Sequence, residues 1–492
     1  MPATIPTTPL KFSETEIQRL FGHEAAEDED PARLREYYFK TKTYDQVSVD
    51  LPLRILVGHK GIGKSALFKI AMAEDKENGL ITVLIRPDDV AMLATDTNDF
   101  LATIREWKSG LSQIIAKRVL AEIGAIDDSW QGKLKQYGGT LISFFEETFR
   151  DTTKISSQPA QKVLIEHFLK RKRISVYIDD LDRGWQGRMQ DNSRISALLN
   201  AVRDLSSENR GINFRISLRS DVYYLVRTSD ESTDKIEGSV VWHSWSNHEI
   251  FVLLVKRIES FFGRKVDERL LLQTKQQALA KYLRPVMEER FQGQGVWENT
   301  PIYRVLMSLI RKRPRDLVKL CSLAGRSARS DNSKIITTKH FQSIFEEYSQ
   351  GRLQDTINEF RSELPAIEKL LLLMKPSKRE RTTHEGYTYT TDALIKKINS
   401  IREQGQFKFA NGELADSKRL AAFMYKINFL TARKELASDV VERKYFEENR
   451  YLSNEFAEFG FDWEIHPAYR WALQPDDIRN IYSTLKLTAD DA

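Results

Sequence analysis

The sequence predicts an α/β fold built on a largely parallel sheet. Three observations predict it. Short apolar runs alternate with segments in which apolar residues recur at helical spacing, which is the order of βαβ units. A glycine-rich segment stands between one such run and the helix that follows it, and a second run ends in closely spaced aspartates. The chain has 492 residues, so a prior of roughly 100–200 residues per domain predicts two to four domains.

Each predicted element of the first half follows from one of two patterns. Apolar or β-branched runs bounded by glycine, proline or acidic residues indicate buried strands, and apolar residues every three to four positions indicate helices. The helix at 246–263 also has a serine cap and a terminal glycine. Strands are predicted at 53–57, 79–87, 174–178 and 238–245, helices at 64–74, over most of 97–170, at 192–209 and at 246–263, and a strand that runs into a helix at 212–225.

The pattern changes beyond residue 264. It is helical up to about 360, without convincing strands, and Pro365 is predicted to open a new helix. Helical patterns follow at 390–404 and 417–435, and then the strand-like SDVVERKYF and FGFDWEIHPAYRWAL. Three helices and a strand pair are the order of a winged-helix-like α+β unit. The predicted domains are a flexible tail at 1–20, a core at 21–263, a helical lid at 264–360 and a winged-helix-like interaction domain at 361–492.

Composition excludes several classes of protein. The one cysteine, Cys321, cannot form an internal disulfide or a cysteine-based zinc site, and its apolar helical surroundings indicate a small core residue. No apolar stretch approaches the roughly 20 residues of a membrane span, and the N-terminus lacks the order of a secretory signal. We therefore expect a cytoplasmic protein without a membrane partner. A net charge of +5 is mild for this length and permits, but does not indicate, contact with nucleic acid.

Residues 58–65, GHKGIGKS, match the pattern G-x-x-x-x-G-K-[ST] in full. A loop with few side chains can point backbone N–H groups at a polyphosphate, and a helix N-terminus favours anions. Lys64 is predicted to reach the β- and γ-phosphates, and the Ser65 hydroxyl to ligate magnesium, so ATP and Mg²⁺ are the expected cofactors. For Lys60 a solvated loop position is an alternative to a phosphate contact. The predicted nucleotide-binding residues are Gly58, His59, Lys60, Gly61, Ile62, Gly63, Lys64, Ser65 and Ala66.

The run VYIDDLD supplies the carboxylates that a magnesium nucleotide site needs. Asp179 ends the predicted strand and is expected to hold the metal, directly or through water. Asp180 is expected to polarise the attacking water. Asp182 is predicted to order the following segment, and Arg183 to pair with it or with a neighbouring subunit, with a plain surface salt bridge as the alternative.

GHKGIGKS together with VYIDDLDRGW resembles the P-loop ATPases of the AAA+/STAND/KAP group. The lead-in FGHEAAEDE and the terminal WEIHPAYRWAL also resemble one bacterial family of such ATPases. The resemblance covers roughly residues 20–345 and implies a P-loop NTPase sheet of the ASCE type. It also implies a polar residue that senses the γ-phosphate, Arg219 with Ser220 as second choice, and a lid arginine, Arg315. Arg227 is a weak candidate for an arginine that acts in trans.

The predicted function is an ATPase that works as a nucleotide-driven switch or oligomerisation regulator, with a homo-oligomer or an effector protein as partner. Asp180 stands where many relatives have glutamate, and its shorter side chain holds the carboxylate further back. Slow, switch-like hydrolysis is predicted, with vigorous motor turnover as the alternative that this residue leaves open. Antiviral defence in bacteria is implied by the resemblance alone. The alternative is a nucleotide-gated DNA-binding protein of the origin-recognition kind with little turnover. Its DNA contacts would come from the predicted third helix, which carries Lys418, Arg419, Lys426 and Arg433. Protein interaction is favoured for that helix.

Overall fold

The computed structural model of the chain contains two compact units. The sheet unit comprises Lys40–Lys60 and Lys64–His243, and the helix-rich unit comprises Met1–Phe39, Gly61–Gly63 and Ser244–Ala492. The structure describes residues 9–94, 99–122, 173–209, 211–229, 231–382, 386–437, 440–450, 452, 460–474, 476 and 478–489.

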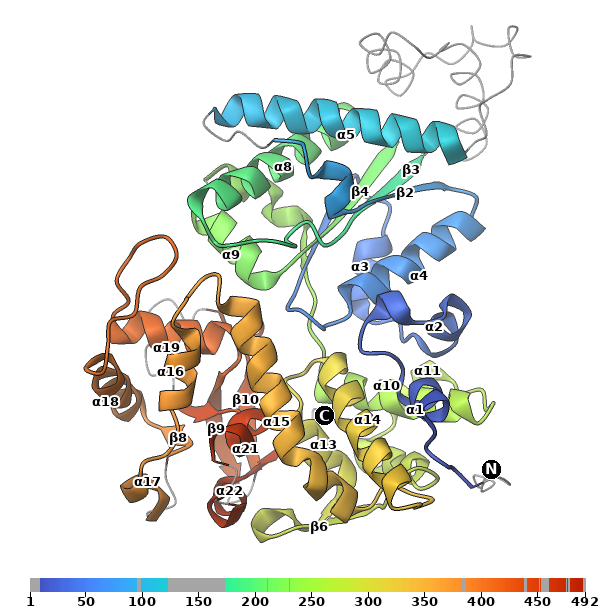
Figure 1. Cartoon of the computed structure of the whole chain (residues 1–492). Helices are drawn as coiled ribbons and strands as arrows, with labels where there is room; N and C mark the ends of the chain where they lie inside the picture. The colour runs from blue at the N-terminus through green and yellow to red at the C-terminus, as the bar shows by residue number, and fades with distance from the viewer. Residues whose placement is uncertain are drawn as a thin grey trace, which may run out of the picture. The chain divides into compact units, whose positions relative to one another are not determined.

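A five-stranded parallel sheet forms the centre of the sheet unit (Figure 1). Its strand order is β2-β3-β4-β1-β5, and every neighbouring pair is parallel. The strand before the glycine-rich loop, β1, is thus separated by β4 from the strand that ends in aspartates, β3. The predicted parallel sheet of an α/β fold is thus confirmed. The strands are β1 (Leu53–Val57), β2 (Ile81–Ile85), β3 (Ile174–Ile178), β4 (Ile212–Leu218) and β5 (Val240–Trp242).

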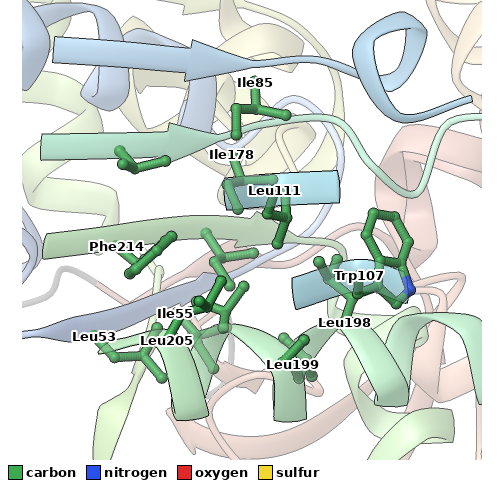
Figure 2. Close-up of a cluster of buried hydrophobic side chains, with 14 of the residues drawn as sticks. Leu53, Ile55, Ile85, Trp107, Leu111, Ile178, Leu198, Leu199, Leu205 and Phe214 are labelled. Carbon is green, nitrogen blue, oxygen red and sulfur yellow. The ribbon is translucent and has the colours of Figure 1, made fainter. Parts of the chain in front are cut away.

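The two faces of this sheet differ in chemistry. Alternate residues of the strands point to opposite faces, and one set is apolar. It packs against α5 (Phe100–Glu122) and α8 (Met189–Glu208), whose residues Trp107, Leu111 and Leu198 belong to the same buried cluster as the strand residue Ile178 (Figure 2). The other face bears polar and aromatic side chains and receives α4 (Lys64–Glu77), whose Phe68 ring meets Tyr177 edge to face.

The predicted elements of this unit agree with the structure, with two adjustments. Helix α8 begins at Met189, three residues before the predicted start, because the Asp191 carboxylate accepts a hydrogen bond of 3.1 Å from the Arg188 N–H at the helix start. Of the segment 97–170, α5 accounts for the helix to Glu122, and residues 123–172 lie outside the described residues. The remaining helices of the unit are α3 (Lys42–Ser48) and α9 (Ser220–Ser229), with short turns η2 (Pro87–Val90) and η3 (Glu231–Ser239).

The helix-rich unit joins an N-terminal segment to the second half of the chain. The predicted capped helix is α10 (Asn247–Phe261), in which Ser246 and Glu249 form a capping box. Cys321 is fully buried in α14, as predicted. The helices up to residue 360 are α1 (Glu14–Phe21), η1 (Ala26–Asp28), α2 (Pro31–Tyr37), α10, α11 (Glu268–Gln273), α12 (Gln276–Leu279), η4 (Ala280–Leu283), η5 (Gly295–Trp297), α13 (Ile302–Leu309), α14 (Pro314–Ser330) and α15 (Thr338–Phe360).

The expectation that 264–360 lacks strands is wrong. Strand β6 (Arg290–Gln292) pairs antiparallel with β7 (Glu298–Pro301). The connection contains Gly293 and Gly295, which allow the chain to reverse, and Phe291 of β6 is buried against Trp297. Both strands are too short to show an alternating pattern in the sequence.

The C-terminal region is α+β, as predicted, with a sheet of order β12-β10-β9-β11-β8. The new helix that Pro365 was predicted to open is α16, and it begins at Ile367, two residues after that proline. The elements are α16 (Ile367–Leu373), α17 (Lys378–Thr382), β8 (Thr388–Tyr389), α18 (Thr391–Arg402), α19 (Ser417–Lys426), β9 (Leu430–Ala437), β10 (Val440–Lys444), β11 (Asp462–Ile465), η6 (Pro467–Tyr469), α21 (Arg470–Leu473), α22 (Ile478–Thr484) and β12 (Leu487–Thr488).

The predicted helix at 417–435 is too long. Helix α19 ends at Lys426, Asn428 takes a positive φ of 57°, and β9 begins at Leu430. Asparagine tolerates this left-handed conformation better than most residues, so it can stop the helix. Arg433 therefore lies on a strand.

Within the described residues, none of the helices has both the length and the apolar character that a membrane crossing requires.

Candidate functional site

The glycine-rich loop joins β1 to α4 at the carboxyl end of the parallel sheet. Gly61 and Gly63 have φ of 79° and 105°, a region that glycine enters without steric cost. The Lys64 ammonium donates hydrogen bonds to the carbonyls of Gly58 (2.8 Å) and His59 (3.3 Å). The lysine thus closes the loop on itself, and Ser65 and Ala66 follow in the first turn of α4.

The first residues of the loop are tied to the end of β4. His59 is fully buried, and its Nδ1 lies 3.0 Å from the hydroxyl of Ser220, which is also buried. The Gly58 N–H donates to the Leu218 carbonyl over 3.2 Å. The structure therefore places Ser220, the second choice for phosphate sensing, directly against the loop.

The middle of the loop, Gly61–Gly63, groups with the helix-rich unit. The Ile62 carbonyl accepts a hydrogen bond of 2.8 Å from the buried indole of Trp245. The Gly61 carbonyl accepts from the Arg315 N–H over 3.3 Å, and a Cβ at Gly61 would lie 3.0 Å from the Cβ and Cδ of Arg315. Lys60 is exposed. Arg315, the predicted lid arginine, thus packs on the loop itself.

Asp179 follows β3 and faces the neighbouring strand. Its carboxylate accepts hydrogen bonds from the Ser217 hydroxyl and, over 3.1 Å, from the Asp180 N–H. The parallel register pairs Ile178 with Ile216, so Asp179 and Ser217 are the next pair along the sheet. Asp180 is exposed and has a φ of 61°, which turns the chain sharply away from the strand.

Asp182 is buried, so the alternative of a plain surface salt bridge is wrong for this carboxylate. Its Oδ2 accepts a hydrogen bond of 3.0 Å from the Arg219 N–H and lies 3.8 Å from Arg219 Nε. The pKa of Asp182 is raised to about 6, mainly by burial and to a smaller extent by the carboxylates of Asp221 and Asp180, against the opposing charges of Lys64 and Arg219. Asp182 therefore ties the turn after β3 to the start of α9.

Arg219 is held by carboxylates in this structure. Its guanidinium donates to both oxygens of Asp221, over 3.1 Å and 2.7 Å, and its side chain is only 17% exposed. Arg227, the weak candidate for a trans-acting arginine, pairs with Glu237. Arg315 donates from Nε to the Glu24 carbonyl over 2.9 Å, which connects it to the lead-in segment of the chain.

The residues present suit a magnesium nucleotide. The Ser65 hydroxyl and the Asp179 carboxylate are oxygen donors, the kind that Mg²⁺ prefers. A cluster of three or more His, Cys, Asp or Glu residues that could hold a metal ion does not occur among the described residues. Magnesium does not require one, because it keeps several waters and binds substrate phosphates. The loop supplies backbone N–H groups and one lysine, which is the donor set for a polyphosphate.

Comparisons with known proteins found one family model, a curated relative of low identity and several solved structures. A model of the FunZ-associated C-terminal helical domain matches residues 249–357, from α10 into α15. The chain is 22% identical over 535 residues to a protein named as transposon gamma-delta 80.3 kDa protein of Escherichia coli (strain K12), with 96% of this chain and 70% of that protein covered.

Solved structures with a similar course of the chain include three archaeal proteins. The Walker-type ATPase PABY2304 of Pyrococcus abyssi is 14% identical, with a TM-score of 0.41 and coverage of 94% of this chain and 100% of that one. Aeropyrum pernix ORC2, in ADPNP–ADP complexes, is 10% identical, with a TM-score of 0.39 and coverage of 98% and 96%. Aeropyrum pernix ORC1 in complex with DNA is 14% identical, with a TM-score of 0.32 and coverage of 97% and 96%.

Three neighbours of the predicted residues were not found from the sequence: Ser217, Asp221 and Trp245. Ser217 becomes a neighbour of Asp179 only through the register of β3 and β4. Asp221 could have been predicted from the sequence as a partner of Arg219, because it stands two residues after it at a helix start. Trp245 lies 183 positions from its partner Ile62, and nothing local connects them.

Proposed function

We propose that the chain binds Mg-ATP and hydrolyses it slowly, as a nucleotide-driven conformational switch. The observation that supports this proposal is the order of three strand ends on one sheet edge. The loop with Lys64 follows β1, Asp179 follows β3, and Ser217 on the intervening β4 donates to Asp179. Phosphate-binding and metal-binding groups thus stand at the carboxyl edge of a parallel sheet, where open α/β sheets bind ligands.

Each residue of this edge receives a role. Lys64 leaves the carbonyls of Gly58 and His59 and directs its charge to the phosphates. Ser65 and Asp179 would hold a magnesium ion, which would supply charge neutralisation when bound. Asp180 orients and polarises the attacking water. Arg219 senses the γ-phosphate, for which it has to exchange its carboxylate partner Asp221 for a phosphate oxygen.

Slow turnover follows from the acidic pair. Asp180 has a side chain one methylene shorter than glutamate, so its carboxylate lies further from a water held at the γ-phosphate. Its backbone is also fixed in the left-handed region, which restricts the directions that the side chain can take.

Phosphate release tests the proposal. The wild type is compared with Lys64→Ala, Asp180→Ala and the control Lys76→Ala, an exposed lysine in the last turn of the same helix. We expect Lys64→Ala to lower the rate about 100-fold, the size of effect seen when one group that stabilises transition-state charge is removed. Asp180→Ala should also lower it, and Lys76→Ala should not. Equal rates in all four proteins would overturn the ATPase assignment.

The alternative is a nucleotide-gated DNA-binding protein, and the relative named for a transposon favours testing it. The predicted DNA-reading helix is less suited to this role than its sequence suggested. Lys426 is buried and paired with Glu363, and Arg433 lies on β9, paired with Glu435 and Thr388. Arg419 pairs with Glu413 at the surface. These pairs favour a protein-docking role for the winged-helix-like region over DNA reading.

Binding to duplex and single-stranded DNA at several salt concentrations decides between the two. Phosphate contacts would make the affinity fall steeply with salt, with and without ATP. Absence of binding would leave the switch acting on a second copy of the chain or on an effector protein. A role in bacterial antiviral defence, and membership of the AAA+/STAND/KAP group, rest on the sequence resemblance. An infection assay with wild type and Lys64→Ala tests the former.

A further inference from the structure

The loop Ile310–Arg313, which connects α13 to α14, has a constrained backbone. Lys312 has a φ of 51°, in the left-handed region that lysine rarely enters. Such a conformation persists only where surrounding contacts enforce it. The contacts that enforce it here come from the C-terminal α+β region of the same unit, more than 130 residues further along the chain.

Side chains from this region contact three of the four loop residues. The hydroxyl of buried Tyr445 lies 3.5 Å from the Ile310 carbonyl, and Tyr469 accepts a hydrogen bond of 2.7 Å from Arg311 Nη1. Glu448 accepts a hydrogen bond of 2.7 Å from Lys312 Nζ, which also lies 5.4 Å from the centre of the Tyr445 ring. Side chains of one surface thus contact three consecutive residues of the loop, Ile310, Arg311 and Lys312.

That surface is itself organised by hydrogen bonds. His466 accepts at Nδ1 from the Ala468 N–H over 3.1 Å, so its Nε2 carries the proton in the neutral ring. Nε2 lies 2.9 Å from the Tyr445 hydroxyl and donates to it, which leaves that hydroxyl to donate to Ile310. Burial, Arg443 and Arg311 hold the pKa of His466 well below its usual range, so this direction of donation is fixed near neutral pH.

The hydrogen-bond network of this loop extends into the first turn of α14. Asp316 accepts from Arg311 over 2.7 Å and 2.9 Å and from Arg352 of α15 over 2.8 Å, and all three side chains are buried. Burial alone would raise the pKa of Asp316, but Arg311 and Arg352 hold it well below its usual range. The carboxylate is therefore charged and fully bonded, and the start of α14 cannot shift without breaking this set.

Arg315 lies in that first turn, next to Asp316, and its N–H donates to the Gly61 carbonyl. Its side chain lies so close to Gly61 that a Cβ added there would stand only 3.0 Å from the Cβ and Cδ of Arg315. A continuous path of contacts within one unit therefore leads from the C-terminal sheet, through Ile310–Arg313, to the glycine-rich loop.

We propose that Tyr445, Glu448 and Tyr469 are positioning residues that set Arg315 against Gly61, so that the C-terminal region controls how the glycine-rich loop receives its nucleotide. This inference rests on the proposed ATP binding for its functional consequence, but not for its structural one. A partner that binds the C-terminal region and moves these side chains changes the affinity of the loop for ATP, and ATP changes the affinity for the partner by the same factor.

The test uses the full chain with Glu448→Gln, Tyr469→Phe and the double variant. The matched control is Tyr389→Phe, which removes another buried tyrosine hydroxyl of the C-terminal region, on β8, one that donates to the Gly386 carbonyl. Hydrogen–deuterium exchange without nucleotide is followed in peptides covering 53–66 and 310–320. We expect exchange to be at least about fivefold faster in both peptides of the double variant, because local opening no longer has to break the hydrogen bonds of Glu448 and Tyr469. The control should leave exchange in both peptides unchanged.

The second readout is the affinity for a fluorescent ATP analogue, measured also in the Arg315→Ala background. Where Arg315 is present, the two substitutions together should weaken binding about three- to tenfold. In the Arg315→Ala background they should have no further effect, because the side chain that contacts Gly61 is already gone. The inference is overturned if exchange at 53–66 stays unchanged, or if the loss of affinity persists without Arg315. If wild type and Lys64→Ala both fail to bind the analogue, the proposed function fails while the exchange data still decide the inference.

Discussion

At the residue scale, the buried carboxyl of Asp182 makes a contribution to stability that depends on pH. It is 5% exposed and bonded to the backbone of Arg219. Its pKa is raised from 3.8 to about 6, mainly by burial and to a smaller extent by Asp221 and Asp180, against the opposing charges of Lys64 and Arg219. Compared with the unfolded chain, the folded protein thus favours the neutral form of this carboxyl. At neutral pH the carboxyl is ionised, and its burial then lowers the free energy of unfolding of the sheet unit.

Asp182→Asn tests this cost in the absence of nucleotide and magnesium. The folded pKa lies above the unfolded one, so the stability that Asp182 contributes is fully present below about pH 4 and is lost as the pH rises through about 6. A difference of about two units corresponds to about 3 kcal/mol. Denaturant unfolding at pH 4 and pH 7 should therefore show the variant gaining about this much, relative to wild type, at the higher pH. Asp180→Asn, at an exposed position, should gain little, and an equal gain would contradict the argument.

The sequence predicted those site residues that a local pattern marks. Lys64, Ser65 and Asp179 stand at fixed places in motifs whose chemistry dictates their type. Ser217 and Trp245 have no such pattern, because each becomes a neighbour only when strands pair or when distant segments pack. Asp182 was given too small a role for a related reason. Its partner Arg219 follows β4 and not β3, so the residues around Asp182 in the sequence do not reveal this contact.

At the element scale, strong local signals gave correct elements and weak ones did not. The bounds of β3 agree with the predicted 174–178, because five apolar or β-branched residues are followed at once by aspartates. The end of α19 was missed, because FLTAR fits both a helical and a strand pattern and only the positive φ of Asn428 decides between them. The strands β6 and β7 were missed because three or four residues carry no measurable period.

The capping box of α10 provides a prediction at this scale. The Ser246 hydroxyl accepts from the Glu249 N–H over 3.0 Å, and the Ser246 N–H donates to the Glu249 carboxylate over 2.8 Å. Ser246→Ala leaves a helix N–H without its partner and should lower the free energy of unfolding by about 1 kcal/mol. Ser207→Ala, an exposed serine in the last turn of α8, should change it by less than about 0.5 kcal/mol. Denaturant titration of both variants checks the difference.

At the scale of the whole molecule, the chain builds its two units from non-contiguous segments. Met1–Phe39 belongs with Ser244–Ala492, while the residues between them, except Gly61–Gly63, form the sheet unit. No local pattern could reveal this, because it depends on contacts such as those of Phe21 and Tyr38 with Arg257 and Lys256 of α10. Chains with separate cores commonly depart from two-state unfolding, so the two units should contribute separately to thermal unfolding.

A buried ionic set allows the helix-rich unit to be weakened alone. Glu464 on β11 accepts from Arg443 over 2.9 Å and 3.1 Å and from Arg470, and all three side chains are fully buried. Burial would raise the pKa of Glu464, but the two arginines lower it to about 2, so the carboxylate is charged at neutral pH. Glu464→Gln leaves two buried guanidinium groups without a counter-charge, a change that typically costs about 3–5 kcal/mol.

Differential scanning calorimetry should show this loss in one transition only. Glu464→Gln should move the transition of the helix-rich unit down by several degrees, while Val176→Ala, a truncation in the core of the sheet unit costing about 2 kcal/mol, should move the other. If both substitutions shift one and the same transition, the units unfold as one cooperative body. In that case a substitution in the C-terminal region would affect the glycine-rich loop by lowering the stability of the whole chain. The contacts through Arg315 would then not be needed to explain the effect.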